Sequence, residues 1–357
     1  MKQNIIITGG GTMGHISPNI ALLPLLTKYY NEVHYIGSKN SLEESKINEL
    51  TKTYSNLYFH AIPSAKLNRS NWFKNFGMPF VILKSIRQTK KLFKTIKPSV
   101  VFSKGGYVSV PVCLVAPKMG IPLVIHESDL TMGLANKLAS RKATTICSTF
   151  PETTKGLKHG VWTGSPVSER LINANKTTIA KKYNLNPQLK TITITGGSLG
   201  AVPINSAIEK ILPNIVKKYN IIHLTGKGKR INFTHHNYHQ EEFSNEIGGI
   251  FKASDLVISR AGSNTIFELA LLKTPMLLIP LSKKVSRGDQ IDNAEYFKKL
   301  KIAEVLPEEN LSNLEDSIDE TIKQLGTLKS ELINQNFTNG LDRLFLEIYK
   351  ATKKHKK

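Results

Sequence analysis

The sequence predicts an α/β protein made of two tandem Rossmann-like domains, each built on a parallel sheet. Short runs rich in Ile, Val and Thr alternate with longer amphipathic stretches, which is typical of βα units. A glycine-rich turn follows one such run in each half, at residues 7–14 (ITGGGTMG) and 194–200 (ITGGSLG), and forms an internal repeat. The length of 357 residues also exceeds what a single hydrophobic core usually supports.

The expected strands are nearly continuous apolar runs, as strands buried on both faces should be. In the first half they lie at 4–8, 33–36, 57–61, 100–103, 123–126 and 144–148. In the second half they lie at 191–195, 221–224, 256–259 and 276–279. Helical periodicity fills the intervals, for example over residues 18–30 and 204–218.

A turn-rich stretch at residues 160–166 (GVWTGSP) marks the expected domain boundary. We therefore expect a first domain over 1–163 and a second over 164–337. Residues 338–357 are amphipathic and end in KKHKK, so we expect a C-terminal helix with a basic tail. An amphipathic helix at this end of the chain could pack against the first domain.

The composition limits the class of protein. Hydrophobic residues make up 40% and charged residues 21% of the chain, as in globular proteins. Cys113 and Cys147 are too few for a disulfide framework or a Cys-based zinc site, and they indicate a reducing compartment. No run of about 18 apolar residues predicts a membrane span.

The net charge of +22 predicts an anionic partner, which is nucleic acid, a phosphate-bearing substrate or an anionic lipid surface. A general preference for Lys, as in proteins encoded by AT-rich genomes, explains the excess equally well. The position of the charge therefore has to decide between these explanations.

A strand, a glycine turn and a helix together form an anion site, because backbone N–H groups and the helix dipole meet there. Gly9-x-Gly11-x-x-Gly14 matches the dinucleotide fingerprint, but the end of the second strand offers Gly37-Ser38-Lys39 instead of the required acidic residue. This mismatch disfavours an NAD-dependent enzyme. The alternative is a glycine turn needed only for close packing.

Further polar clusters follow other strands, at residues 103–109 (SKGGYVS), 126–129 (HESD) and 259–268 (SRAGSNTIFE). In the last cluster, N–H groups and hydroxyls are suited to a phosphate, and Glu268 to a ribose diol. The Gln290 amide is suited to sugar hydroxyls. These residues could also lack a binding role; Glu268, for example, could be an ordinary solvent-exposed residue of a helix.

Histidine supplies the candidate for proton transfer. His15 lies at the start of the first helix, where an imidazole can take a proton from an attacking hydroxyl or bind a phosphate. We expect His126 and His159 to be structural. The spacing of His235, His236 and His239 resembles a metal site, but the surrounding polar stretch has no strand or strong helix signal, so we expect no metal.

With these motifs the chain resembles the MurG-type N-acetylglucosaminyltransferases of bacterial cell-wall synthesis, which have two Rossmann-like domains and a cleft between them (the GT-B fold). The resemblance covers nearly the full length. The motifs that carry it are GGGTMGH at 9–15, SKGGYVSVP at 103–111, HESDLTMGLANK at 126–137, TGGSLGA at 195–201, SRAGSNTIFE at 259–268 and RGDQIDNA at 287–294.

The resemblance implies that the second domain binds UDP-N-acetylglucosamine and that no cofactor is needed. The implied donor-binding residues are Gly197, Ser198, Ser244, Arg260, Ser263, Asn264, Thr265, Glu268 and Gln290. The backbone around Phe243 and Ser244 would face uracil. The implied acceptor-site or cleft residues are Thr12, Gly14, Gly105, Gly106, Glu127 and Asp129, with His15 as the catalytic group.

The chain departs from the family pattern in three places. Met13 replaces the middle glycine of the family's GTGGH, and Ser128-Asp129 replaces the Gln-Asn of its HEQN. Ser168 stands where the family linker carries an Arg that reaches the donor, and Arg170 follows two residues later. That contact is either lost or taken over by Arg170, and loss is favoured because a two-residue shift on a helix turns the side chain away.

By the same resemblance, the reaction is an inverting transfer of N-acetylglucosamine to the 4-hydroxyl of undecaprenyl-pyrophosphoryl-N-acetylmuramoyl-pentapeptide (lipid I), giving lipid II. The protein would be peripheral on the cytoplasmic face of the cell membrane. An epimerase of UDP-N-acetylglucosamine is the alternative from another enzyme class. A nucleic-acid binder is disfavoured, because the aromatic residues do not interleave with the basic ones along a groove.

The segment 67–97 has the composition of a membrane-contacting surface. Aromatic and apolar residues gather at its start: Trp72, Phe73, Phe76, Met78, Pro79 and Phe80. A helix follows whose basic residues recur at helical spacing: Lys84, Arg87, Lys90, Lys91, Lys94 and Lys97. An apolar tip beside a basic face suits an anionic leaflet, although a core segment followed by a solvated Lys face gives the same pattern.

Overall fold

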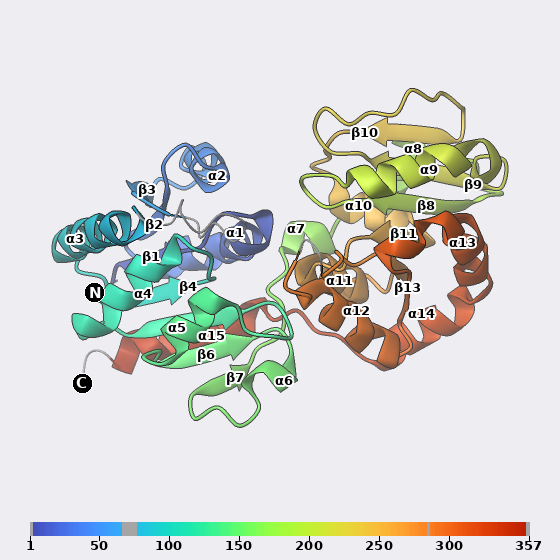
Figure 1. Ribbon diagram of the computed structural model, residues 1–357. Coiled ribbons are helices and arrows are strands. Elements are labelled where there is room, and N and C mark those ends of the chain that lie inside the picture. The colour runs from blue at the N-terminus through green and yellow to red at the C-terminus, as the bar shows by residue number, and fades with distance from the viewer. Residues whose placement is uncertain (1–2, 66–76, 284–285, 355–357) are drawn as a thin grey trace. The chain divides into compact units, whose positions relative to one another are not determined.

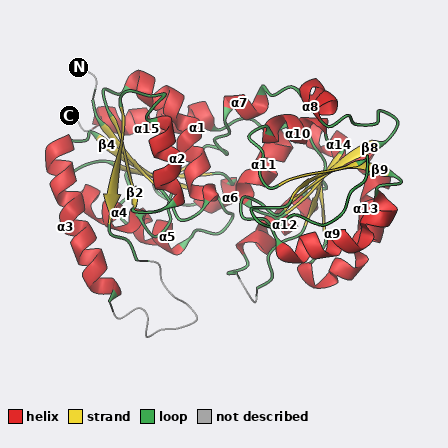
Figure 2. Cartoon of the chain, turned by 90° about the horizontal axis from the view of Figure 1, so that it is seen from above, coloured by secondary structure: helices red, strands yellow, loops and turns green. Residues whose placement is uncertain are grey.

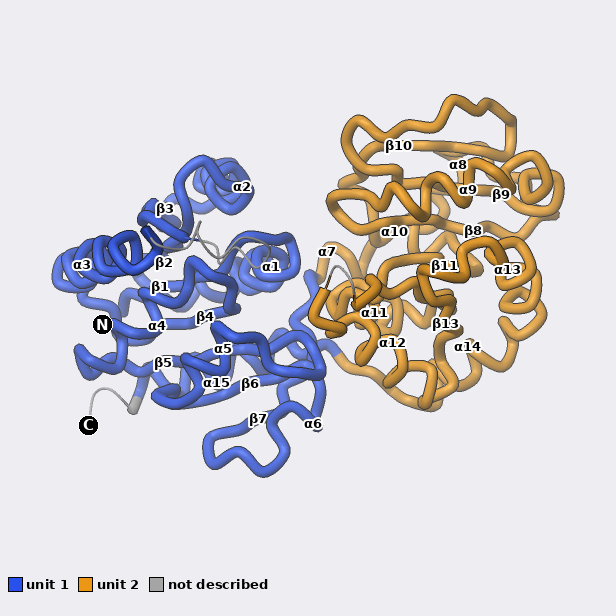
Figure 3. The backbone as a smooth tube through the Cα atoms, viewed as in Figure 1, with its two compact units in different colours: residues 1–168, 339–357 blue, residues 169–338 orange. Residues whose placement is uncertain are grey.

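The computed structural model describes residues 3–65, 77–283 and 286–354. The chain divides into two compact units (Figure 3): unit 1 comprises residues 1–168 with 339–357, and unit 2 comprises residues 169–338. The division falls after Ser168. The stretch 160–166, which we expected to be a boundary, contains a short strand that belongs to unit 1.

Unit 1 contains a seven-stranded sheet in the order β3-β2-β1-β4-β5-β6-β7, with every neighbouring pair parallel (Figure 1). The strands are β1 (Ile5–Thr8), β2 (Val33–Ser38), β3 (Leu57–Ile62), β4 (Val100–Ser103), β5 (Leu123–Glu127), β6 (Thr145–Ser148) and β7 (Gly160–Trp162). This is the Rossmann strand order, which reverses between β1 and β4 and so opens a ligand site at the carboxyl ends of those strands.

Helices cover both faces of this sheet (Figure 2). They are α1 (Met13–Tyr29), α2 (Leu42–Leu50), α3 (Met78–Ile96), α4 (Ser109–Lys118), α5 (Leu134–Ser140), the short α6 (Pro151–Thr154) and α15 (Leu341–Lys354). Alternate residues of β1 face opposite layers, because Ile5 and Ile7 pack with α1, α2 and α15, whereas Ile6 packs with α3, α4 and α5.

The last helix, α15, belongs to unit 1 although unit 2 precedes it in the chain (Figure 1). Leu344 and Ile348 are buried against the sheet, and the Tyr30 hydroxyl lies 2.6 Å from the Thr352 hydroxyl. The chain therefore returns to its first unit after completing the second.

Unit 2 repeats the topology in a six-stranded parallel sheet, in the order β10-β9-β8-β11-β12-β13. The strands are β8 (Lys190–Thr195), β9 (Tyr219–Leu224), β10 (Tyr238–Glu241), β11 (Leu256–Ser259), β12 (Met276–Leu278) and β13 (Ala303–Val305). The expected fold class, two Rossmann-like parallel α/β domains, is confirmed.

The helical elements of unit 2 are α7 (Glu169–Ile172), α8 (Lys176–Lys182), α9 (Val202–Ile215), α10 (Ile247–Ala253), α11 (Ser263–Leu271), α12 (Asp289–Lys299), the 3-10 helix η2 (Glu308–Asn313), α13 (Leu314–Lys323) and α14 (Leu325–Asn334). Residues of α9 and α13 pack on one face of the sheet, and residues of α8 and α10 on the other. Both faces are therefore buried, as the continuous apolar strands predict.

The strands that sequence reasoning missed are β7, β10 and β13, and all three are sheet edges. Each has only one neighbour and at most one fully buried residue, so none carries a continuous apolar run. The expectation that the stretch around His239 has no strand was wrong, because β10 forms there against β9.

The helix expected after residue 80 is α3. The basic residues expected on its surface are all exposed: Lys84, Arg87, Lys90, Lys91, Lys94 and Lys97. Phe80 is 78% and Leu83 46% exposed at the same amino-terminal end. Trp72, Phe73 and Phe76 lie outside the described residues. Among the described helices, none combines the length and the apolar character that a membrane crossing requires.

Candidate active site

In unit 1 the loop after β1 is held by a carboxylate from α2. Glu43 is fully buried, and its oxygens accept hydrogen bonds from the Gly11 N–H at 3.3 Å and the Ser38 N–H at 3.2 Å. Gly11 has φ +87°, and a Cβ on Gly10 would lie 2.4 Å from the Glu43 carboxylate. The glycines therefore give the backbone room to close around an anion that the protein itself supplies.

The contact between Glu43 and Gly11 argues against dinucleotide binding at this turn. The Gly11 N–H, which a bound pyrophosphate would need, already has the Glu43 carboxylate as its acceptor. No carboxylate occupies residues 37–39, as the sequence indicated. Met13 is the first residue of α1 and has no positive φ, so the departure from the family glycine introduces no backbone strain.

His15 lies in the first turn of α1, which follows this loop directly in the chain. Its Nδ1 is 3.2 Å from the Thr12 hydroxyl, and its ring also hydrogen-bonds to the Gly10 backbone. Burial, with the nearby Lys104 ammonium as the second cause, lowers the pKa of His15 to about 4. The imidazole is therefore neutral near pH 7, which is the form that can accept a proton.

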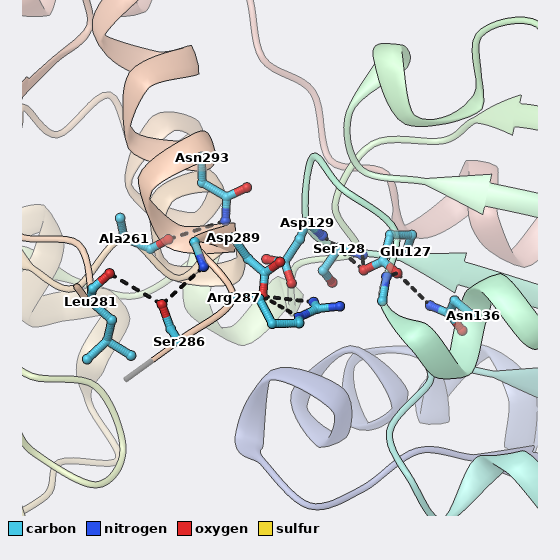
Figure 4. Close-up of polar contacts among 12 residues, drawn as sticks. Glu127, Ser128, Asp129, Asn136, Ala261, Leu281, Ser286, Arg287, Asp289 and Asn293 are labelled. Carbon is cyan, nitrogen blue, oxygen red and sulfur yellow. Dashed lines mark hydrogen bonds and ion pairs between the residues drawn. The ribbon is translucent and has the colours of Figure 1, made fainter. Parts of the chain in front are cut away.

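The loop after β5 is organised by Glu127, another buried carboxylate (Figure 4). One oxygen accepts from the N–H groups of Ser128 (2.9 Å) and Asp129 (3.1 Å), and the other accepts from the Gly133 N–H and the Asn136 side chain, both at 2.9 Å. With these bonds made inside the loop, Glu127 shapes the site more than it presents a free oxygen to a ligand.

The glycine pair after β4 joins these two loops. Gly105 and Gly106 have φ +93° and +89°. A Cβ on Gly106 would lie 2.3 Å from the Gly10 carbonyl oxygen, and one on Gly105 would lie 3.1 Å from the Asn136 amide. Both positions thus need glycine for packing as well as for any ligand, which keeps the packing explanation open at this loop.

In unit 2 the glycine loop after β8 is more open. Gly197 has φ +82°, nothing lies within 4 Å of where its Cβ would be, and Gly197 and Ser198 are both exposed. The loop is tied down from outside, because Lys229 Nζ donates to the carbonyls of Leu199 (2.6 Å) and Gly200 (3.2 Å). A phosphate can therefore approach the backbone of a fixed turn.

The start of α11 provides a second anion-binding feature on the same carboxyl edge. Gly262 is its N-cap residue and has no side chain to cap the helix, and Ser263 begins the first turn. Asn264 and Thr265 are the next two residues and are partly exposed. Backbone N–H groups and hydroxyls at such a helix start favour a bound phosphate group.

Arg260, expected to serve the diphosphate, is engaged inside unit 2. Its guanidinium pairs with Glu308 and donates to the carbonyls of Ile279 (3.2 Å) and Pro280 (3.4 Å). The residue is only 8% exposed. Contact with a ligand through this side chain would require at least one of these partners to be released.

Glu268 lies in the second turn of α11 and is partly buried. Burial raises the pKa of its carboxyl to about 7. A carboxyl that is costly to ionise gains most from new hydrogen-bond donors, and a ribose diol supplies two of them.

Gln290 lies near the start of α12, beside a loop that holds itself in place. Its Oε1 accepts from the Leu281 N–H at 3.1 Å, and among the described residues its amide nitrogen has no partner. Arg287 pairs with Asp289 at 2.8 Å, and Asn293 donates to the Ala261 carbonyl at 3.3 Å, so α12 is tied to the loop before α11 (Figure 4).

Ser244 follows β10 and is 7% exposed, and its hydroxyl accepts from the Glu246 N–H at 3.2 Å. Phe243 beside it is 56% exposed. The His235 and His236 rings are 4.1 Å apart, whereas His239 lies against Tyr183. The described residues include no group of three or more His, Cys, Asp or Glu side chains arranged for a metal ion.

A large groove in unit 2, about 840 Å³ in volume, lies away from these motifs. It is at the opposite edge of the sheet, where Lys190, Asp255 and Pro275 adjoin the starts of β8, β11 and β12. Lys176, Lys252, Lys273 and Lys329 also line it. It contains none of the glycine turns, so we assign the candidate site to the carboxyl edges of the sheets and give the groove no role in it.

Sequence reasoning missed Glu43, Lys104 and Asn136 as organisers of unit 1. Lys104 and Asn136 stand inside motifs that were recognised, but their residue types gave no reason to single them out. Glu43 carried no motif signal, because it acts from α2 on a loop 32 residues earlier in the chain. Ser168 is the last residue of unit 1 before the division, and Arg170 is exposed on α7.

Two parallel α/β units with glycine loops at their carboxyl edges are the architecture of GT-B glycosyltransferases. MurG from Acinetobacter baumannii shares this fold with a TM-score of 0.73 at 23% identity, covering 98% of this chain and 100% of that one. The calicheamicin glycosyltransferase CalG4 has a TM-score of 0.70 at 9% identity, covering 99% of each chain.

Sequence comparison narrows the class to a family. The glycosyltransferase family 28 N-terminal domain matches residues 5–148, and the C-terminal domain of that family matches residues 191–344. This chain therefore belongs to glycosyltransferase family 28, and the expected resemblance to MurG-type enzymes is confirmed.

Curated relatives cover almost the whole chain. The UDP-N-acetylglucosamine–N-acetylmuramyl-(pentapeptide) pyrophosphoryl-undecaprenol N-acetylglucosamine transferase of Lachnospira eligens is 48% identical over 315 residues, which is 87% of this chain and 88% of the relative. The enzyme of the same name from Clostridium tetani is 43% identical over 352 residues, with 96% and 97% covered.

Proposed function

We propose that this protein transfers N-acetylglucosamine from UDP-N-acetylglucosamine to the 4-hydroxyl of the N-acetylmuramoyl group of lipid I, giving lipid II. The observation that carries the proposal is the similarity to the two curated N-acetylglucosamine transferases described above, which are 48% and 43% identical over 87% and 96% of this chain. The open glycine loop and the α11 helix start of unit 2 support it, because they suit a sugar-nucleotide diphosphate.

In the proposed reaction, the acceptor oxygen forms a bond to the anomeric carbon of the sugar from the face opposite UDP. The bond between that carbon and the β-phosphate oxygen breaks, and UDP leaves with the electron pair. The proton of the attacking hydroxyl passes to the neutral imidazole of His15, which is the catalytic group on unit 1. Because the new bond forms on the face opposite the bond that breaks, the configuration of this carbon inverts.

The donor-binding residues of the proposal lie in unit 2. Gly197 and Ser198 meet the phosphates, together with the first turn of α11 at Ser263, Asn264 and Thr265. Glu268 accepts from the ribose diol, and the amide nitrogen of Gln290 donates to the sugar. The charge on the phosphates is met by N–H groups and hydroxyls, so transfer proceeds without a divalent cation.

The acceptor side of the proposal is the carboxyl edge of unit 1, at Thr12, Gly14, Gly105, Gly106 and Asp129. Its lipid tail requires the protein to rest on a membrane. The amino-terminal end of α3 is suited to this contact, because exposed Phe80 and Leu83 adjoin the exposed cations Lys84 and Arg87. We propose a peripheral position on the cytoplasmic face, with roles in cell shape and division that follow from cell-wall synthesis.

The test is an incubation of the purified protein with labelled UDP-N-acetylglucosamine, with and without lipid I. Label should enter the lipid fraction only when acceptor is present, and UDP should be released in equal amount. Conversion of the free sugar nucleotide without acceptor would select an epimerase instead. Activity abolished by EDTA and restored by Mg²⁺ would contradict metal-independent transfer.

A further inference from the structure

Lys104 is a fully buried cation at the carboxyl edge of unit 1. It is the first residue after β4 and is 1% exposed. Among the described residues, no carboxylate lies within ion-pair distance of its ammonium, whose hydrogen-bond acceptor is the Ser128 hydroxyl. Burying an ammonium without a direct counter-ion is costly, so a fold keeps one only where something offsets the cost.

The position of Lys104 joins the loops that carry the candidate acceptor site. Its backbone N–H donates to the Thr8 carbonyl at 2.9 Å, next to the loop that leads to His15. A Cβ on Gly9 would lie 3.0 Å from the Lys104 Cβ and 2.8 Å from the His15 carbonyl oxygen, so these two residues flank one glycine. The side chain then reaches the loop after β5 at Ser128.

The charges around Lys104 and His15 come from three elements. Burial lowers the pKa of Lys104 to about 8, whereas Glu127 and Asp129 raise it, so the side chain is still mostly cationic at pH 7. His15 faces Lys104, Asp129 of the loop after β5, and Glu43 of α2. The two carboxylates favour a protonated ring, and Lys104 is the one titratable group among these that opposes them.

We propose that Lys104 is a positioning residue of the transferase site: it fixes the loop after β5 through Ser128, and its buried charge offsets the two carboxylates that face His15. Lys104 is too buried to contact substrate and acts through these neighbours. The catalytic consequence rests on the proposed function, but the effect on His15 does not, because it can be measured without substrate.

The experiment uses the full chain and follows the histidine ring signals by NMR as the pH is changed. The His15 signals are assigned from the spectrum of a His15→Gln variant. In Lys104→Met, the midpoint of His15 should rise by about one pKa unit, because the opposing charge is gone. Lys118→Met, which removes an exposed lysine at the end of α4, should leave the His15 midpoint where it is in the unaltered protein.

An unchanged His15 midpoint in folded Lys104→Met would overturn the proposal. If this variant does not fold, the unaltered protein still gives an answer. The His15 signals should then show a second inflection near pH 8, where Lys104 loses its proton, and the lack of that inflection would also overturn the proposal.

Ser128→Ala tests the loop contact separately, because it keeps the charge and removes the acceptor of the hydrogen bond. It should leave the His15 midpoint unchanged and raise the KM for lipid I several-fold, as expected for the loss of one hydrogen bond. An unchanged KM would overturn the loop-fixing part. If the unaltered protein transfers no sugar at all, the proposed function fails while the NMR result still stands on its own.

Discussion

The Glu43 carboxylate and the Gly11 N–H are joined by a hydrogen bond of 3.3 Å, so the first glycine turn of this protein closes on an internal anion. In a dinucleotide-binding domain the equivalent turn would meet a pyrophosphate. Here α2 supplies the negative charge, and the turn serves to hold Thr12 and His15 at the start of α1. The dinucleotide fingerprint Gly9-x-Gly11-x-x-Gly14 therefore predicts the shape of the turn correctly. It does not identify a dinucleotide as the ligand.

Replacing Glu43 with Ala should destabilise unit 1, because the N–H groups of Gly11 and Ser38 both lose their acceptor. We expect the free energy of unfolding in urea to fall by about 1–3 kcal/mol. Glu49→Ala on the same helix is the control, since Glu49 is exposed and its pair with Lys46 at 3.6 Å contributes about 0–1 kcal/mol. Equal unfolding midpoints for the two variants would refute the anchoring role.

The sequence was sufficient to predict the central strands and the succession of strands and helices along the chain. Strands such as β4 and β11 are buried on both faces, and their apolar runs coincide with the observed bounds. Edge strands such as β10 are buried at one residue only, so their sequence has no such run. The edge strand β3 was still predicted, at residues 57–61, so local pattern fails only at the edge strands that lack an apolar run.

The candidate site was predictable to a different extent in the two units. The open loop at Gly197 and the helix start at Ser263 are local in sequence, and both were identified from their motifs. The anchoring of unit 1 depends on contacts that are distant in sequence, such as Lys104 to Ser128 and Glu43 to Gly11. Pairing of this kind follows from the fold and is absent from any single segment.

The apolar end of α3 should contribute to membrane binding. Phe80→Ser combined with Leu83→Ser should weaken sedimentation with anionic vesicles by about tenfold or more, because each side chain loses apolar contact area with lipid. Ile333→Ser is the matched control, since Ile333 is 56% exposed on α14 of unit 2. Vesicle binding that the α3 variant retains in full would exclude this surface.

Glu268 should make UDP binding depend on pH. The folded state holds this proton more tightly than the unfolded state, because the pKa is raised from 4.5 to about 7. Its contribution to stability is therefore fully present below pH 4.5 and is lost as the pH rises through about 7. Binding of a ribose diol favours the ionised carboxylate, so UDP affinity should increase between pH 6 and pH 8.

Glu268→Gln separates this effect from the titration of UDP itself. At pH 8 we expect calorimetry to show UDP binding weakened by about 1.5–3 kcal/mol, as for a hydrogen bond to a charged group. The affinity of the variant should depend on pH only through the titration of UDP itself. The unaltered protein should show an additional pH dependence that comes from Glu268. Identical affinity and pH profiles in the two proteins would remove Glu268 from the donor site.

His15 has two possible roles, and kinetics distinguish them. As the base, it accepts the proton of the attacking hydroxyl; with a pKa of about 4 the ring is neutral at pH 7 and can accept a proton, but it is a weaker base than a free imidazole. As a positioning group, it would hold the acceptor through the same helix start. Burial is the main cause of this low pKa, and the Lys104 charge is the second.

His15→Ala should lower kcat by roughly 10²–10⁴ while UDP affinity stays unchanged, if the ring is the base. The pH profile of the unaltered enzyme should then show no loss of rate near pH 6.5 that belongs to this residue, because the ring is already neutral there. His159→Ala, at an exposed histidine just before β7, is the control and should keep normal kinetics. A His15→Ala enzyme with near-normal kcat at saturating lipid I and a raised KM for it would end the base assignment and leave the positioning role.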